Sequence, residues 1–448
     1  MSQTALPLDT PEGGRRVAML PTRPEDARVW RPVRNQAEMM VRDLDSLVPE
    51  DHPARAIWAF LEGLDLSAFY ASVKVTVDTP GRPASDPRVL LALWVYATAE
   101  GVGSARQLDR LCQEHDAYRW LRGGVPVDYH LLSDFRVAHQ EALDRLLTEI
   151  VAALMANDLV TLKQVAQDGV KVRASAGAGS FHRRSRLEEC MVEAEEQVKR
   201  LAQEQKHPDP ETTRQKQAAR ERVARGRAGR VRQALDQMSL VQAAKKRQER
   251  TLAKTKRKKI TEARVSTTDP EARVMKMPDG GWRPAYNVQL ATDVGSGVIV
   301  GAGVVNQGND SGQAPPMEEQ LRQRTGVHPG AYLMDGGYAQ RDDIGTLEGR
   351  HVTVYAPVRP PRTTTSGRER NSPRDDDSPA VIAWRQRMET TEAKSLYKMR
   401  AATAEWANAQ MRSHGLLSFT VRGLHRVLSV VLLVVVTHNV LRGLALAS

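Results

Sequence analysis

The sequence predicts an α/β domain that a helical insertion interrupts and an all-helical region precedes. Three observations support this prediction. Two strand-like runs, 165–172 and 331–334, place an aspartate beside a glycine near their ends. Residues 37–157 have the apolar spacing and capping residues of helices. Between the two strand-like runs, residues 181–260 have the pattern of long basic helices.

The first part of the chain divides into a lead and a helical domain. Residues 1–30 are rich in proline, glycine and polar side chains, so we expect a flexible lead. We assign residues 31–157 to a helical N-terminal domain. Its arginines could grip phosphates, and a packing or dimerisation role would explain the same helices equally well.

Helix starts can be predicted within this domain. Asp86 followed by Pro87 is a typical N-cap and first turn, and Ser104 can cap a second helix. We expect Ser133 and Asp134 to open a third helix, which would end near Asn157.

The insertion at residues 181–260 contains the excess positive charge. It holds 23 Lys and Arg against 11 Asp and Glu, and the formal net charge of the whole chain is +11. Apolar side chains step by four and three, as in a coiled-coil seam, at Leu187, Met191, Ala194, Val198 and Leu201. We therefore expect two antiparallel helices, joined at Pro208 and Pro210, that form an arm.

Two roles are open for this arm. Its cations could line duplex DNA and bind it with little sequence preference, or its seam could pair with a second subunit. We favour DNA binding, with the densest cations at Lys254, Lys256, Arg257, Lys258 and Lys259.

Three carboxylates are the candidate catalytic residues. Asp168 lies in the first strand, Asp335 follows the second, and Glu405 lies on a helix predicted over 380–411. An Asp–Gly pair alone is usually a turn, and a lone Glu is usually a surface side chain. Together, however, three carboxylates suit hard divalent cations, and two such ions can clamp an in-line phosphoryl displacement. Other candidates for the second acid are Asp269, Asp293 and Asp310; we retain Asp335.

Three sequence blocks contain these acids: 167–174, 334–338, and the series Tyr397, Arg400, Glu405 and Arg412. They resemble the blocks of bacterial insertion-sequence transposases of the DDE (Asp-Asp-Glu) class. More closely, they resemble the branch of insertion sequence eleven-eighty-two. With further similar blocks, the resemblance extends over most of residues 30–445. These further blocks are 100–106, 120–124, 133–136, 268–289 and 405–410.

The resemblance implies a fold and a reaction. The fold is an RNase H-like catalytic domain with a mixed five-stranded sheet over 158–448, in which 358–380 would be a mobile loop. Asp168, Asp335 and Glu405 would hold two Mg²⁺ ions, with Mn²⁺ as a substitute. The enzyme would cut DNA at the ends of the element and transfer the 3′-hydroxyl ends into target DNA.

The resemblance also implies DNA contacts for Tyr397, Arg400 and Arg412. In the wider superfamily three residues separate the arginine from the glutamate, and a lysine follows after six more. Here four residues separate Arg400 from Glu405, and Arg412 stands in the lysine position. Arginine keeps the charge that binds phosphate.

Two alternatives remain open at this stage: a two-metal nuclease that cuts without joining, and a catalytically silent or domesticated DNA-binding relative. The expected partners are double-stranded DNA and further copies of the chain, as a homodimer or a larger assembly. The apolar run 427–436 is too short for a membrane span and suits a buried core element. Cys112 and Cys190 fit a reducing compartment, so we expect a soluble, nucleoid-associated protein of the bacterial cytoplasm.

Overall fold

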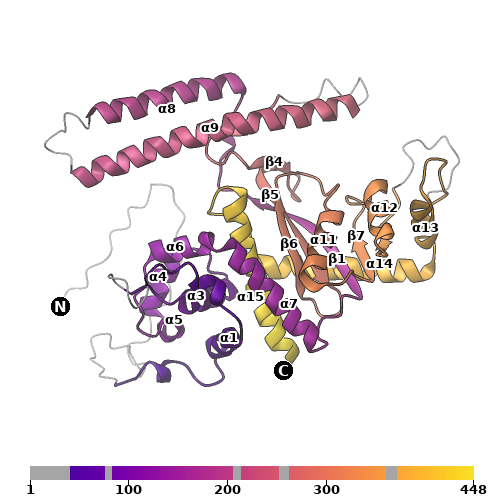
Figure 1. Cartoon of the computed structure of the whole chain (residues 1–448), viewed down its shortest axis with the longest axis horizontal. Helices are drawn as coiled ribbons and strands as arrows, with labels where there is room; N and C mark the ends of the chain where they lie inside the picture. The colour runs from indigo at the N-terminus through magenta and orange to yellow at the C-terminus, as the bar shows by residue number, and fades with distance from the viewer. Residues whose placement is uncertain (1–40, 76–82, 205–212, 252–261, 360–370, 448) are drawn as a thin grey trace, which may run out of the picture. The chain divides into compact units, whose positions relative to one another are not determined.

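The computed structural model describes residues 41–75, 83–204, 213–251, 262–359 and 371–447. Leu44–Ser448 form one compact unit. Within this unit, the described residues form seven helices before the first strand of a mixed sheet and a pair of long helices after it. Four strands then follow one another, and the last two strands alternate with helices (Figure 1). The predicted lead, residues 1–30, lies outside the described residues.

The predicted helical region is confirmed. After a short 3-10 turn at Asp45–Leu47, its helices are α1 Pro53–Glu62, α2 Ser67–Tyr70, α3 Pro87–Ala99, α4 Ala105–Glu114, α5 Asp116–Arg122, α6 Tyr129–Ala138 and α7 Gln140–Ala156.

Two of the three predicted helix starts are correct. The Asp86 carboxylate accepts a hydrogen bond from the Arg88 amide, and Ser104 caps α4. The third is wrong, because α6 begins earlier, where Asp128 accepts the Leu131 amide, and runs through the position of Ser133. Aspartate is as good an N-cap residue as serine, so the sequence offers a cap at Asp128 as well as at Ser133.

The last helix, α15 (Leu424–Ala447), joins the helical region to the sheet. It packs against α1, α3, α6 and α7 on one side and against strand β6 (Ile299–Val305) on the other. By length and composition this helix could cross a membrane, but 61% of its most apolar window is buried inside the protein. The predicted buried element at 427–436 is therefore confirmed. The domain boundary at 157/158 stays a prediction, since one apolar cluster contains residues from both sides of it.

The main sheet is mixed and five strands across, as predicted. Along the chain its strands are β1 Gln164–Arg173, β4 Arg273–Lys276, β5 Trp282–Asp293, β6 Ile299–Val305, β7 Ala331–Met334 and β8 Thr353–Tyr355. The order is β4-β5-β1-β7-β8, and β6 pairs with the half of β5 that β4 leaves free. Strand β1 is antiparallel to β5 and parallel to β7. A separate small sheet pairs β2 (Phe181–His182) with β3 (Val265–Ser266).

Four helices complete this part of the chain: α11 Ala314–Thr325, α12 Arg341–Gly349, α13 Pro379–Arg387 and α14 Thr391–Ser413. The single helix predicted over 380–411 is in fact two. Thr390 breaks it, because its hydroxyl accepts a hydrogen bond from the Ala393 amide and so caps a new helix. Arg400, Glu405 and Arg412 all remain on α14, which packs across β1, β5, β7 and β8 (Figure 1).

The mobile loop at 358–380 stays a prediction, and the described residues near its end make buried polar contacts. Asp377 forms a 2.6 Å ion pair with Arg385, and both side chains are almost fully buried. The Arg374 amide also donates to Asp377, so this stretch is held against α13. Residues 360–370 lie outside the described part of the chain.

The insertion contains the predicted pair of helices, α8 (Arg184–Glu204) and α9 (Arg214–Thr251), which lie side by side (Figure 1). They are antiparallel, since Leu187 shares an apolar cluster with Met238 while Glu193 pairs with Arg227.

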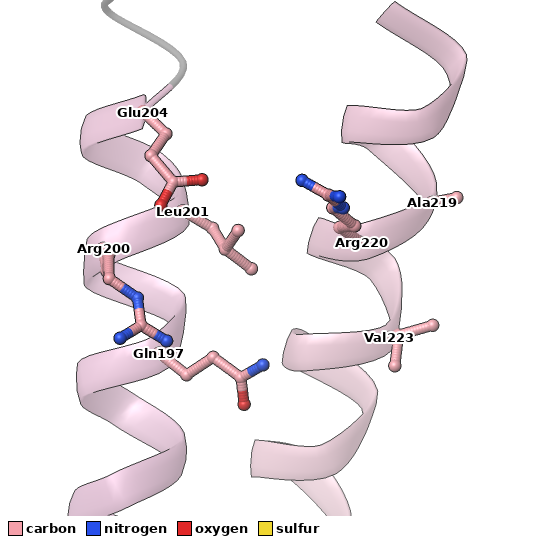
Figure 2. A pocket seen from close by; sticks show the side chains of 7 residues that line it. All are labelled: Gln197, Arg200, Leu201, Glu204, Ala219, Arg220 and Val223. Carbon is pink, nitrogen blue, oxygen red and sulfur yellow. The ribbon is translucent and has the colours of Figure 1, made fainter. Parts of the chain in front are cut away.

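Farther along, the two helices are less closely packed. A cavity of about 740 Å³ opens between them, and Leu201 and Arg220 point into it while Ala219 points away from α8 (Figure 2). Leu201, the last residue of the predicted seam, is only half-buried. A helix pair is therefore shown, but a coiled-coil arm is not established. The predicted cations Lys254, Lys256, Arg257, Lys258 and Lys259 lie outside the described residues.

Candidate active site

Two of the three predicted acids lie side by side in the sheet. Strands β1 and β7 are parallel, and their last paired residues are Gln167 and Met334. Asp168 is the next residue of β1, and Asp335 is the first residue after β7, so the register places them next to each other. Strand β7 ends at this point, whereas β1 continues to Arg173.

Helix α14 covers Asp168. The Arg400 guanidinium donates to Asp168 Oδ1 at 2.5 Å, and the Asn408 amide donates to Asp168 Oδ2 at 2.8 Å. Arg400, Ala404 and Asn408 are four residues apart, so they form one face of the helix. Burial raises the pKa of Asp168, the charge of Arg400 lowers it, and the nearby charge of Asp335 raises it again. Arg400 is therefore the counter-ion of a carboxylate that burial would otherwise disfavour.

Asp335 is fixed by the turn that follows it. Its Oδ1 accepts the Gly337 amide at 2.6 Å, which is the local bond of an Asx turn. Tyr397 of α14 is half-buried nearby. Burial raises the pKa of its phenol, and the charges of Arg400, Asp335 and Asp168 all act on it. The structure thus brings Arg400 to Asp168 and Tyr397 near both aspartates.

Glu405 occupies a different position from the two aspartates. Its side chain is exposed, and it forms no hydrogen bond or ion pair with another described residue. It lies three residues before Asn408 and seven before Arg412, so it shares their side of α14. Asn408 and Arg412 line a cavity of about 350 Å³ together with Asp168. Glu405 is therefore on the flank of this cavity, and the buried Ala404 takes the inward position next to it.

The cavity beside Asp168 is rich in positive charge. Lys171, Lys276 and Arg412 line it, and none of them forms an ion pair within the described part of the chain. Three unpaired cations next to a carboxylate are a suitable surface for a phosphodiester backbone. Arg412, which we predicted from sequence to bind DNA, is one of them.

The chemistry of the two aspartates fits a divalent metal ion. Carboxylate oxygens are the ligands that Mg²⁺ and Mn²⁺ prefer, and two like charges held together favour a cation between them. Across the described ranges, however, no group of three or more His, Cys, Asp or Glu side chains is close enough to hold a metal ion. Asp168 and Asp335 therefore supply two carboxylates, and Glu405 is not in contact with either.

The rival acids have different roles. Asp269 is buried and accepts the Tyr286 hydroxyl at 2.7 Å, and Asp293 accepts the Ser296 amide at 2.9 Å in the turn between β5 and β6. Both are structural hydrogen-bond acceptors. Asp310, which we had set aside as a loop residue, lies close to Asp335 over Gly337.

The sequence reasoning missed two groups in the site: the Asn408 contact with Asp168, and a buried polar network behind β1. The network consists of Gln167, Asn287, Gln289 and Asp310. A signal for it exists, since Asn287 and Gln289 are polar residues at alternate positions of an otherwise apolar strand.

Comparison with known families gives two matches. The family model described as "Transposase domain (DUF772)" matches residues 42–138. The family model described as "Transposase DDE domain" matches residues 250–439. The chain belongs to the DDE transposases. No curated protein and no solved structure matches the chain.

The family match and the structure complement each other. The DDE match contains Asp335 and Glu405 of the transposase but begins well after Asp168. The structure places β1 between β5 and β7 in the centre of the same sheet, so Asp168 belongs structurally to the matched region. The order of strands and helices is consistent with an RNase H-like DDE domain.

Proposed function

We propose that this transposase cuts DNA at the ends of an insertion sequence and joins the freed 3′-hydroxyl ends to target DNA. The single observation that supports this most is the position of Asp168 and Asp335. They follow paired residues of two parallel strands, and Asp168 lines a cavity together with three cations.

We further propose that Asp168, Asp335 and Glu405 hold two Mg²⁺ ions, for which Mn²⁺ can substitute. Bound Mg²⁺ lowers the pKa of an attacking water or hydroxyl and stabilises the leaving oxygen. Arg400 balances the charge of Asp168 when no cation is present. Arg412 and Lys276 hold the phosphate backbone beside the acids.

We propose that DNA outside the active site binds the helical insertion at residues 181–260 of the protein. Helix α9 presents exposed cations along its length, at Arg214, Lys216, Arg220, Arg222, Lys246, Arg247 and Arg250. Such contacts to phosphates are strong, sensitive to salt and nearly independent of sequence. We extend this role to the cluster at 254–259, and we assign the binding of element ends to the N-terminal domain.

Three finer assignments belong to the same proposal. The sequence blocks place the transposase in the branch of insertion sequence eleven-eighty-two. Bridging of two DNA ends favours a dimer or a larger assembly on DNA. We place the protein at the nucleoid in the bacterial cytoplasm.

The test is a joining assay. Purified protein is incubated with Mg²⁺, a DNA fragment carrying the element with its own flanks, and a target plasmid. We expect metal-dependent 3′ ends and products covalently joined to the plasmid. Cutting without joined products would support a two-metal nuclease instead. Binding without cutting would support a catalytically silent relative.

A further inference from the structure

Asp310 lies in the loop between β6 and α11 and is held by two amides. Its Oδ1 accepts hydrogen bonds from Asn287 Nδ2 and from Gln289 Nε2, both at 2.8 Å. Both donors come from β5, and both side chains are buried. The carboxylate is therefore fixed in place by neutral donors. No Lys or Arg in the described ranges forms an ion pair with it.

The same carboxylate touches the backbone next to both catalytic aspartates. A Cβ atom at Gly169, the residue after Asp168, would collide with Asp310 Oδ1. A Cβ atom at Gly337 would lie 3.5 Å from Asp310 Oδ2 and 2.8 Å from Asp335 Oδ1. Glycine at position 169 lets Asp310 approach closely, and Gly337 is within ordinary contact distance of its other oxygen. The carboxylate thus spans from β1 to the turn that fixes Asp335.

Strand geometry defines which acid Asp310 can act on. Successive side chains of β1 point to opposite faces, so Asp168 faces α14 while Gly169 faces the Asp310 loop. Asp310 therefore supports β1 from behind Asp168. Its Oδ2, in contrast, lies on the same turn as the Asp335 carboxylate.

A buried polar network extends from Asp310 into the core. Gln289 Oε1 accepts the Tyr338 hydroxyl at 2.5 Å and the Gln167 amide at 3.0 Å. One oxygen is left over: Asn287 Oδ1 is buried without a hydrogen-bond partner and lies 3.0 Å from the Cβ position of Gly169. Beside Asp310 there is thus a second buried oxygen that accepts no hydrogen bond from the described residues.

We propose that Asp310 is a positioning residue of the active centre, whose charge strengthens the binding of a divalent cation at Asp335. This inference rests on the metal site proposed above. The carboxylate orients the two backbone segments that present Asp168 and Asp335, and it adds negative charge where a dication would bind. Groups behind the ligands of a metal typically change its affinity by about 10- to 100-fold.

A purely structural role would make a different prediction, because asparagine can replace the hydrogen bonds of Asp310. In an Asp310→Asn variant the new side-chain oxygen can accept from both amides, so the fold and the melting temperature should be kept. The negative charge is removed, and an amide nitrogen takes the place of Oδ2 near Gly337. The variant therefore separates charge from packing.

The experiment measures Mn²⁺ binding by the whole chain without DNA, from the electron paramagnetic resonance signal of the free ion. We expect Asp310→Asn to weaken Mn²⁺ binding by about 10-fold. Asp343→Asn is the matched control. Asp343 accepts the Gly312 amide at 2.9 Å and so anchors the same loop from α12. We expect near wild-type affinity for this control.

The outcomes distinguish the two proposals. Absence of Mn²⁺ binding by the wild type, or unchanged binding by Asp335→Asn, would contradict the metal site itself. If the wild type binds and Asp335→Asn does not, then unchanged affinity in Asp310→Asn would overturn the role of Asp310. Equal losses in Asp310→Asn and Asp343→Asn would overturn it too, since loop anchoring would then explain both.

A second variant protects the test against misfolding of the first. Asn287→Ala removes one of the two amides that hold Asp310 but keeps its charge. We expect a smaller loss of Mn²⁺ affinity than in Asp310→Asn. A loss of Mn²⁺ affinity as large as that of Asp310→Asn would show that the position of the Asp310 carboxylate, and not its charge, determines the affinity.

Discussion

Asp168→Asn and Asp335→Asn are each expected to lower the rate of DNA cleavage by roughly 10³-fold or more, with DNA binding near the wild-type level. Asparagine keeps the shape of each side chain but removes the negative charge that a divalent cation needs. In Asp335→Asn the side-chain oxygen can still accept the Gly337 amide, so the turn is kept. Single-turnover cleavage and a filter-binding titration measure the two quantities.

The fold should tolerate both changes. Burial raises the pKa of Asp168, so the charged form is disfavoured there, and a neutral amide avoids that cost. This gain offsets the loss of the counter-ion of Arg400, from which the asparagine oxygen can still accept a hydrogen bond. Melting temperatures close to that of the wild type are therefore expected. Asp342→Asn, an exposed carboxylate seven residues after Asp335, serves as the control and should cleave normally. Loss of DNA binding in both Asp168→Asn and Asp335→Asn would show that these acids are structural.

Glu405→Gln is expected to reduce cleavage to a similar extent without any change in stability. Glu405 is exposed and has no partner among the described residues, so glutamine removes a charge and no contact. Any loss of activity would then arise from the reaction itself. Cleavage rate and melting temperature, measured on the same preparation, separate the two effects.

A matched control lies on the same helix. Glu392 is exposed in the first turn of α14, and Glu392→Gln should leave cleavage unchanged. Wild-type cleavage by Glu405→Gln would identify Glu405 as an ordinary surface carboxylate. The active site would then have to be built from Asp168, Asp335 and a different third ligand.

The sequence predicted the strands of the site well, because the alternating run around Asp168 and the apolar run before Asp335 have clear local patterns. Once Asp168 and Asp335 are placed on parallel neighbours, their proximity follows from the register. Helix α14 was also predicted, since Arg400, Glu405 and Arg412 lie in a stretch without glycine or proline. These predictions depend on interactions that are close in sequence.

Features that depend on tertiary contacts could not be predicted. Whether Asn408 faces Asp168 is decided by the rotation of α14 on the sheet, which the helical period alone leaves open. Asp310 had the pattern of a loop residue, and only the folded chain brings it to Gly169 and Gly337. The break at Thr390 was missed because a threonine caps a helix or lies within one, depending on the path of the preceding chain.

The most direct test of the proposed centre is iron-mediated cleavage of the protein. Fe²⁺ bound in place of Mg²⁺ produces hydroxyl radicals in the presence of ascorbate and peroxide, and these cut the nearby backbone. We expect cuts close to Asp168, Asp335 and Glu405 that excess Mg²⁺ suppresses and that Asp335→Asn abolishes. Cuts at other positions, or none that Mg²⁺ suppresses, would contradict the assignment of these acids to one metal centre.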